Sequence, residues 1–268
     1  MSAMPDFHDD PPTREDSCEK HGAYEARNLF GEMWTKCPTC ADERRAAERE
    51  QEERQNRFDQ QMRWKEKLIG AGIPERFRNR TLESYLADTD EQRHALHFAE
   101  RYAGNFAQVL AAGRCAVFVG KPGTGKTHLA VGIGLAIMGD GYSALFTTAM
   151  RALRRIKDTW QRNSDYSERQ AVESLVFPDL LILDEVGIQF GSDTEKLLLF
   201  DVLNERYERR KPTILLSNLT VNEVSDYLGE RIFDRLREDD GQVVVFGWQG
   251  HRGRLASAGR DLAAGADA

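Results

Sequence analysis

The sequence contains no apolar run that approaches the roughly 20 residues of a membrane-spanning helix. Its first residues also lack the basic and apolar regions of a secretory signal peptide, so we expect a cytoplasmic protein with no membrane partner. Basic residues are too few for a bulk electrostatic grip on DNA, since 37 Lys and Arg against 44 Asp and Glu give a net charge of −7. Any contact with nucleic acid must then rely on a local basic patch.

Cysteine is also scarce, and the four cysteines are unevenly spaced, which in a cytosolic setting favours metal binding over a disulfide framework. Cys18, Cys37 and Cys40 join His21 to form two close-spaced ligand pairs separated by a short loop. That pattern is typical of a structural zinc site, and so small a module needs the metal for its folding energy. The alternative is three unrelated thiols and a surface histidine. Cys115 is expected to be a small buried apolar residue.

Residues 120–127 read Gly-Lys-Pro-Gly-Thr-Gly-Lys-Thr and match the P-loop pattern G-x-x-x-x-G-K-[ST] without departure. Apolar residues precede this loop and an apolar helix, 127–138, follows it, which disfavours a mere connecting turn. Lys126 is expected to reach the β- and γ-phosphates of ATP, and Thr127 to offer its hydroxyl to Mg²⁺. The backbone cradle and the first helical turn complete the predicted nucleotide contacts: Gly120, Pro122, Gly123, Thr124, Gly125 and His128.

Asp184 and Glu185 follow the apolar run 180–183, so both carboxylates emerge at the C-terminal end of a buried strand. Sheets of the α/β class bind their ligands at that end. Asp184 is suited to hold Mg²⁺, directly or through water, and Glu185 to polarise the water that attacks the γ-phosphate. An acidic helix cap is the alternative, which a complete P-loop upstream disfavours. The two adjacent acids therefore indicate ATP hydrolysis.

The alternation of strands and helices after residue 90 predicts an α/β domain with a parallel sheet. Its expected strands are 115–119, 143–147, 180–183, 213–217 and 242–246. By composition the chain divides into a disordered N-terminus, a zinc-binding module, a long charged helix, the ATPase domain and a disordered tail: residues 1–17, 18–40, 41–69, 70–256 and 257–268.

The expected helix over 41–69 has balanced charge and almost no apolar stripe in its first half. Its second half gathers apolar side chains, among them Phe58, Met62 and Ile69. This end either docks on the main domain of the chain or presents a face to a partner helix, and the residues leave both alternatives open.

Polar residues after the later strands add to the predicted site. Asn218 could hydrogen-bond the attacking water or the γ-phosphate if its strand lies beside the Asp184 strand, with a simple turn asparagine as the alternative. Arg231 and Arg235 share a helical face, where an arginine could act as a finger in a neighbouring subunit's site or belong to a solvated helix. Arg252 could close over the nucleotide or belong to a basic tail.

Together these motifs resemble those of the bacterial DnaC-type replicative helicase loaders, which are AAA+ ATPases of the initiator clade. The resemblance implies a P-loop AAA+ domain with a five-stranded parallel sheet in the order 5-1-4-3-2, and self-association with ATP. It implies that Asn218 is sensor 1, that Arg235 with Arg231 forms the finger in trans, and that Arg252 is the sensor-2 residue. The implied partners are a DnaB-type hexameric helicase and single-stranded DNA.

The segment 150–175 is similar to the initiator-clade insertion that lines a single-stranded DNA channel. The implied DNA contacts are Arg151, Arg154, Arg155, Lys157 and Trp160, with Tyr166 available for base stacking. A solvated helix with a core tryptophan is the alternative. The zinc motif departs from the enterobacterial loaders and resembles the loaders of Gram-positive bacteria and phage-encoded DnaC-like proteins. This departure leaves open which helicase is bound and how.

The favoured function is therefore ATP-dependent loading of a hexameric replicative helicase onto single-stranded DNA during replication initiation or restart. An IstB-like ATPase that assists a transposase on duplex DNA shares nearly the same core, and the zinc module favours the loader without deciding. A nucleotide-gated adaptor without hydrolysis is a third interpretation, against which Glu185 and Arg235 argue. The sequence does not identify the residues that contact adenine. The fold places these contacts near 72–82, through backbone and apolar groups.

Overall fold

The computed structural model describes residues 11–162, 164–187 and 193–250. The chain divides into two compact units, Met1–Glu66 and Lys67–Ala268. Among the described residues no helix is both long enough and apolar enough to cross a membrane. The expected disordered tail, 257–268, lies outside the described residues.

The first unit begins with a small antiparallel sheet in the order β1-β2-β3. Its strands are β1 (Thr13–Cys18), β2 (Gly22–Phe30) and β3 (Met33–Trp34). The expectation that residues 1–17 are disordered is wrong for the part that forms β1, because a tight turn returns the chain and β2 satisfies the backbone of β1 residue by residue. The guanidinium of Arg14 also covers the Trp34 ring, 4.4 Å from its centroid. Residues 1–10 lie outside the described part of the chain.

Helix α1 (Pro38–Gly70) is 33 residues long, and Leu68 is its one buried residue. Its surface carries pairs of opposite charge one turn apart, such as Arg44 with Glu48 and Arg54 with Glu50. Such pairs stabilise a solvated helix by a few tenths of a kcal/mol each. Phe58 and Met62 are exposed on this helix, at 57% and 42%.

The second unit is built on a five-stranded parallel sheet in the order β5-β6-β7-β4-β8. The strands are β4 (Ala116–Gly120), β5 (Ala144–Thr148), β6 (Leu180–Val186), β7 (Thr213–Ser217) and β8 (Gln242–Phe246). When the strands are numbered from the P-loop strand and listed from the β8 edge, this order is 5-1-4-3-2, which confirms the predicted AAA+ arrangement. The P-loop strand is therefore flanked by the last two strands of the domain.

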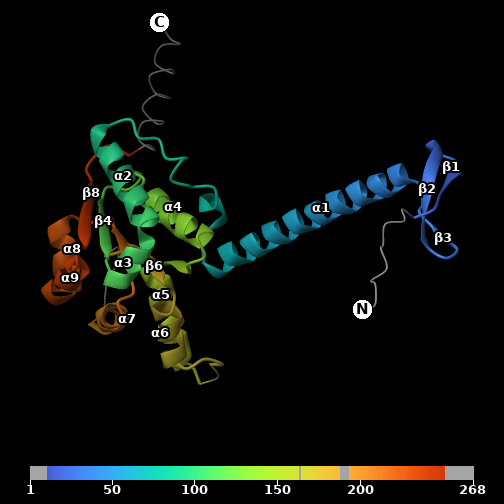
Figure 1. Ribbon diagram of the computed structural model, residues 1–268. Helices are drawn as coiled ribbons and strands as arrows, with labels where there is room; N and C mark the ends of the chain where they lie inside the picture. Colours follow the sequence, from blue (N-terminus) through green and yellow to red (C-terminus); the bar gives the residue numbers. More distant parts are fainter. Residues whose placement is uncertain (1–10, 163, 188–192, 251–268) are drawn as a thin grey trace, which may run out of the picture. The chain divides into compact units, whose positions relative to one another are not determined.

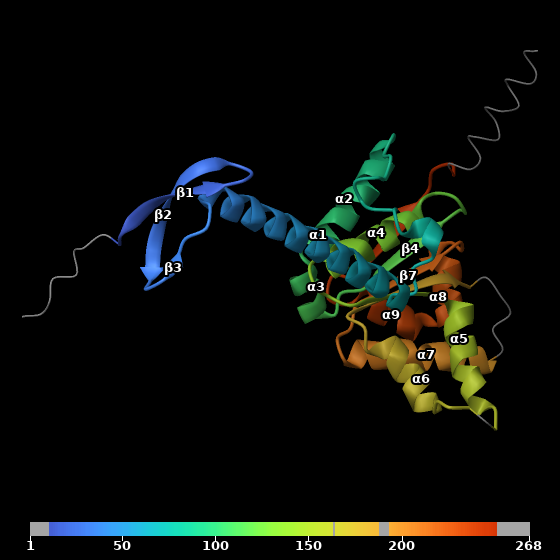
Figure 2. The same cartoon turned by 90° about the vertical axis from the view of Figure 1, so that its right-hand side faces the viewer.

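Helices cover both faces of this sheet (Figures 1 and 2). One face carries α2 (Asp90–Gly104), α3 (Phe106–Ala112) and α4 (Lys126–Gly139). The other carries α5 (Ala149–Lys157), α6 (Glu168–Val176), α7 (Asp193–Glu208), α8 (Val221–Leu228) and α9 (Glu230–Arg237). Short 3₁₀ turns, η1 (Glu75–Phe77) and η2 (Asp158–Trp160), precede α2 and follow α5. The apolar strands are thus buried on both faces, as a parallel sheet requires.

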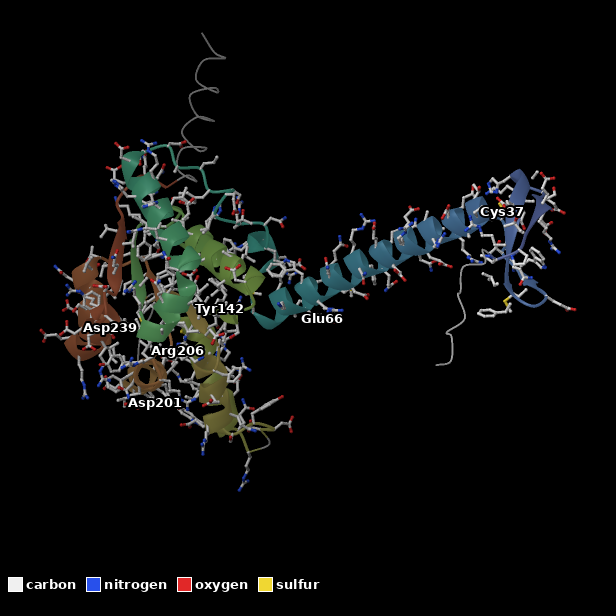
Figure 3. The ribbon with its side chains drawn as sticks, viewed as in Figure 1. Cys37, Glu66, Tyr142, Asp201, Arg206 and Asp239 are labelled. Atoms are coloured by element: carbon white, nitrogen blue, oxygen red, sulfur yellow. The ribbon has the colours of Figure 1, made fainter. Side chains whose placement is uncertain are left out.

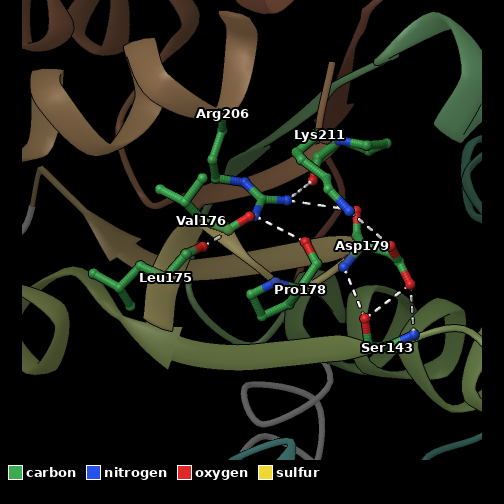
Figure 4. A network of polar contacts seen from close by, with 8 residues as sticks. Ser143, Leu175, Val176, Pro178, Asp179, Arg206 and Lys211 are labelled. Atoms are coloured by element: carbon green, nitrogen blue, oxygen red, sulfur yellow. Dashed lines mark hydrogen bonds and ion pairs between the residues drawn. The ribbon is translucent and has the colours of Figure 1, made fainter. Parts of the chain in front are cut away.

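A single buried arginine joins the second helical layer to the sheet (Figure 4). Arg206 on α7 is 1% exposed and donates from Nε to the Thr213 hydroxyl at 2.9 Å. Its terminal nitrogens donate to a group of backbone carbonyls: Leu175, Val176, Pro178 and Pro212. Burial lowers its pKa to about 10. Because two of these carbonyls end α6, the arginine fixes the position of α6 against β7.

Candidate functional site

The P-loop spans the turn between β4 and α4. Gly125 immediately precedes α4 with φ 98°, and a Cβ at this position would lie 2.7 Å from the Tyr85 ring. Gly120 has φ 142°, and a Cβ there would lie 2.3 Å from the Phe246 carbonyl oxygen. Glycine is therefore required at both positions, by backbone conformation and by close approach.

Lys126 is buried at the start of α4. Its ammonium donates to the carbonyls of Gly120 and Lys121 at 2.6 and 2.9 Å, and to the Asn218 side-chain oxygen at 2.9 Å. Burial lowers the pKa of Lys126 to about 8, against the opposing effect of the nearby Asp184 carboxylate. The lysine thus already lies among oxygen acceptors at the place where phosphates would bind.

Thr127 and Asp184 meet beside it. The Thr127 hydroxyl donates to Asp184 Oδ2 at 2.9 Å. Asp184 is the last residue of β6 that pairs with β5. It is half-buried, and this burial raises the pKa of its carboxyl. A hydroxyl and a carboxylate at this separation are the hard oxygen ligands that Mg²⁺ prefers, so these residues fit the ion that the family implies.

Glu185 has a backbone conformation that the sequence does not reveal. Its φ is +61°, and the pairing of β6 with β7 shifts register between Leu183 and Val186. The bulge leaves the Glu185 side chain exposed, while Ser217 Oγ on β7 donates to the Val186 carbonyl at 2.6 Å and holds the bulged strand. A non-glycine residue in this region is strained, and such strain gathers at functional sites.

The strand of Asn218 does lie beside the strand of Asp184, because β7 pairs in parallel with β6. Strand β7 also pairs with β4 on its other side. Asn218 therefore lies next to the Asp184 strand, as its predicted role at the γ-phosphate requires. Its contact with Lys126 ties the end of β7 to the P-loop.

A cavity lies beside Gly123, Thr124 and Gly125 of the P-loop. His128 lines it and is held by the Thr81 carbonyl at 2.9 Å and by Ser84 Oγ at 3.1 Å. The other lining residues come from segments distant in the chain and include Tyr85, Gln92 and Trp248. None of these three was predicted as a nucleotide contact, because each lies outside the P-loop and in a different segment of the sequence.

The arginines of α9 differ in their surroundings. Arg235 lies over the Tyr207 ring, 4.6 Å from its centroid, and donates to the Asn204 side chain on α7. Arg231 is exposed and has no side-chain partner among the described residues. Arg252 lies outside the described part of the chain.

A groove of about 610 Å³ is lined by α5, by α6 and by the segment that joins them. Arg151, Arg154 and Arg155 line it and are exposed, and none of them has an acidic partner within the described chain. The other two predicted DNA contacts are paired within the domain: Lys157 binds Glu195 at 2.6 Å, and the Trp160 indole donates to Glu168. Tyr166 lines the groove and is 68% exposed.

The four predicted zinc ligands come together in the first unit, where Figure 3 labels Cys37. The Sγ atoms of Cys18 and Cys40 are 3.5 Å apart, and His21 Nδ1 lies 3.9, 3.7 and 3.3 Å from the sulfurs of Cys18, Cys37 and Cys40. A tetrahedral zinc ion with Zn–S bonds of about 2.3 Å has S···S edges of about 3.8 Å, so the cluster is compatible with zinc.

The thiols of the cluster influence one another's protonation. Backbone N–H groups of Lys20 and His21 lower the pKa of Cys18 to about 6, whereas the hydrogen bond with Cys18 raises the pKa of Cys40 to about 11. The thiolate is the form that binds a metal, so Cys18 is the thiol prepared to bind it first. His21 Nε2 lies 3.1 Å from Glu43 Oε1, a contact that fixes the ring with Nδ1 towards the thiols. No position remains for a water ligand, which suits a structural role.

Comparison with known proteins finds similarity over most of the chain. The family model of the IstB-like ATP binding proteins matches residues 50–245. The replicative helicase loader DnaC of Escherichia coli K12 is 35% identical over 203 residues, which cover 76% of this chain and 80% of that protein. The protein of the same name from Buchnera aphidicola subsp. Schizaphis graminum is 34% identical over 196 residues, covering 73% of this chain and 78% of that one.

Solved structures agree with this similarity. A crystal structure of the DnaC helicase loader superposes with a TM-score of 0.58 at 26% identity and covers 64% of this chain and 99% of that chain. The replication initiator DnaA bound to AMPPCP and single-stranded DNA superposes with a TM-score of 0.55 at 21% identity, over 66% of this chain and 51% of that chain. The second likeness extends to the fold alone.

Proposed function

The chain belongs to the family of the IstB-like ATP binding proteins and the DnaC replicative helicase loaders, and from this membership we propose that it loads a hexameric replicative helicase onto single-stranded DNA at the expense of ATP. The observation that carries the proposal is the 35% identity to a named helicase loader over 80% of its length. Membership of an ATP-binding family, together with the intact P-loop, makes ATP the nucleotide.

The geometry supports a separate role in ATP hydrolysis for each residue of the site. Lys126 binds the β- and γ-phosphates, and Asn218, already in contact with Lys126, orients the γ-phosphate. Glu185 stands exposed at the end of β6, where it can accept a proton from the attacking water. Thr127 and Asp184 would hold Mg²⁺, and the ion would supply positive charge that offsets the charge of the phosphate oxygens.

Assembly would complete the site. In this proposal Arg235, with Arg231 beside it on α9, enters the nucleotide site of a neighbouring copy and stabilises the charge of the transition state. Arg235 must first leave Asn204 and Tyr207, so hydrolysis would depend on contact between subunits. Arg252 is proposed as the sensor-2 residue on the strength of the family resemblance alone.

Single-stranded DNA is proposed to bind the groove between α5 and α6. The unpaired guanidinium groups of Arg151, Arg154 and Arg155 suit a phosphate backbone, and Tyr166 offers an exposed ring to the bases. Lys157 and Trp160 would join only if they left Glu195 and Glu168. A groove of this kind gives an acidic chain a local basic surface.

The first unit is proposed to bind the helicase. Zinc held by Cys18, His21, Cys37 and Cys40 would stabilise the small sheet, and the exposed Phe58 and Met62 of α1 would offer apolar contacts.

The test is size-exclusion chromatography with light scattering, on the chain mixed with a hexameric replicative helicase from a plausible host. With ATP and Mg²⁺ we expect one large complex, and Glu185→Gln should retain it longer, because ATP stays bound without hydrolysis. Glu100→Gln, exposed on α2, is the control and should behave as the unchanged chain.

The IstB-like alternative has one specific observation in its favour, the family model that bears that name. It predicts that ATP drives self-assembly on duplex DNA and that no complex forms with a helicase. That result would replace the helicase-loading proposal.

A further inference from the structure

The cavity beside the P-loop has a composition suited to a flat aromatic ligand. Rings of Tyr85, His128 and Trp248 line it, and Tyr85 and His128 meet edge to face with centroids 5.2 Å apart. The Trp248 indole donates to the Thr124 carbonyl at 2.9 Å, and the Tyr85 hydroxyl reaches the same oxygen at 3.5 Å. Two aromatic residues, 163 positions apart (248 − 85), are therefore fixed to one atom of the P-loop.

Gln92 brings a directional polar group to this cavity. It is 6% exposed, and its Oε1 accepts from the backbone N–H groups of Asp88 and Thr89 at 2.7 and 3.1 Å, which caps α2. These two bonds determine the orientation of the amide, so that Nε2 is the atom left over. Within the described part of the chain, the hydrogen bonds of the Gln92 side chain all use Oε1, and the side chain lines the cavity.

An amide N–H donor held in one orientation can distinguish adenine from guanine. N1 of adenine is a hydrogen-bond acceptor, whereas N1 of guanine carries a hydrogen. A hydrogen-bond donor placed opposite N1 therefore binds adenine. With guanine it would face another donor, and a buried polar group would lose its hydrogen-bond partner, which lowers affinity.

We propose that this cavity is the base subsite of the nucleotide site, and that Gln92 Nε2 selects adenine by donating to N1 while the base stacks against Tyr85, His128 and Trp248. The inference rests on the proposed binding of ATP and adds the residues that read the base. It extends the base contacts beyond the expected 72–82 segment, of which Arg80 lines the cavity, to Tyr85, Gln92 and Trp248.

The test is the change Gln92→Glu, with ATP and GTP labelled on the ribose, so that the bases stay unmodified. The glutamate keeps an oxygen for the N–H groups of Asp88 and Thr89 but replaces the donor with an acceptor. We expect affinity for ATP to fall about tenfold while affinity for GTP does not fall, as for the loss of a buried hydrogen bond. Gln108→Glu, the same change at an exposed position of α3, should leave both affinities unaltered.

If Gln92→Glu leaves the ratio of the ATP affinity to the GTP affinity unaltered, the proposal is overturned and Gln92 serves only to cap α2. If the unchanged protein binds both nucleotides equally, base selection fails while nucleotide binding stands. If it binds neither, the proposed ATPase function fails as well.

A second variant keeps the test decisive should Gln92→Glu not fold. Trp248→Leu removes one of the rings that line the cavity, and stacking does not discriminate between purines. We expect both affinities to fall about tenfold, with their ratio preserved. Unchanged affinities in Trp248→Leu would show that the base binds elsewhere.

Discussion

The ammonium of Lys126 and the side-chain oxygen of Asn218 lie 2.9 Å apart, 92 residues apart in sequence. This contact joins the loop after β4 to the end of β7, the neighbouring strand. Since Lys126 also donates to two loop carbonyls, all three of its N–H bonds are directed at protein oxygens. Bound phosphates would take the place of some of these acceptors, so the end of β7 would respond to the nucleotide.

The buried lysine predicts a dependence of stability on pH. Its pKa is about 8 in the folded protein and near 10.5 when the chain is unfolded, so the unfolded state binds more protons between these values. Stability should therefore rise with pH across that window. Relative to Lys126→Met, the free energy of unfolding should increase by about 3 kcal/mol at most between pH 8 and pH 10.5.

Urea unfolding at several pH values measures this difference. Lys121→Met, an exposed position in the same loop, is the matched control and should show no comparable rise. A flat difference between the unchanged protein and Lys126→Met would contradict the buried state of Lys126.

The trans finger predicts a pattern of complementation. Arg235→Ala should bind ATP yet lose hydrolysis by about 10³-fold, because the neighbouring site lacks its guanidinium. Mixing Arg235→Ala with Lys126→Ala should restore part of the activity, since the second variant still donates its arginine to the intact P-loop of the first. Phosphate release measures both effects.

Arg237→Ala is the control for the finger. Its guanidinium lies over the Phe233 ring of the same helix, and its loss should leave turnover unchanged. Normal hydrolysis by Arg235→Ala alone would rule out the assignment, as would mixtures that never exceed the sum of their parts.

The basic groove predicts a salt effect. Replacing Arg154 and Arg155 by Gln should weaken binding of single-stranded DNA and lower the slope of log K against log salt by about 0.7 for each lost phosphate contact. Fluorescence anisotropy of a labelled oligonucleotide at several salt concentrations gives both quantities. Arg101→Gln, exposed on α2, should change neither. An unaltered slope in the double variant would place the DNA elsewhere.

The zinc cluster predicts independent unfolding of the first unit. Cys37→Ser should release the metal and expose residues 11–66 to proteolysis, because three ligands hold zinc poorly and the small sheet has little core. ATP binding by the second unit should persist. Cys115→Ala, a buried cysteine outside the cluster, should retain zinc. Full zinc content in Cys37→Ser, or loss of ATP binding with the metal, would count against this account.

Much of this architecture could be predicted because its signals are local. The P-loop spacing, the apolar strand before Asp184 and the order of strands and helices all lie within short stretches of sequence. The resemblance to one family then supplied the strand order, which the structure confirms. The cysteine and histidine spacing likewise predicted a cluster whose ligand atoms the structure brings together.

Features that depend on tertiary contacts could not be predicted. The positive φ of Glu185 arises from the bulge between β6 and β7, and no residue type announces it. Gln92 and Trp248 reach the P-loop from opposite ends of the domain. The ordered β1 was missed because its polar, Asp-containing sequence resembles a solvated segment, while its order comes from pairing with β2.

The most direct measurement is helicase activity on closed circular single-stranded DNA that carries one annealed oligonucleotide. A ring helicase cannot thread onto a circle, so displacement of the oligonucleotide reports loading. We predict that the chain with ATP raises displacement well above the helicase alone, and that Glu185→Gln suppresses it by holding the helicase in the loaded complex. Equal displacement with and without the chain, for helicases that it is shown to bind, would contradict the central claim.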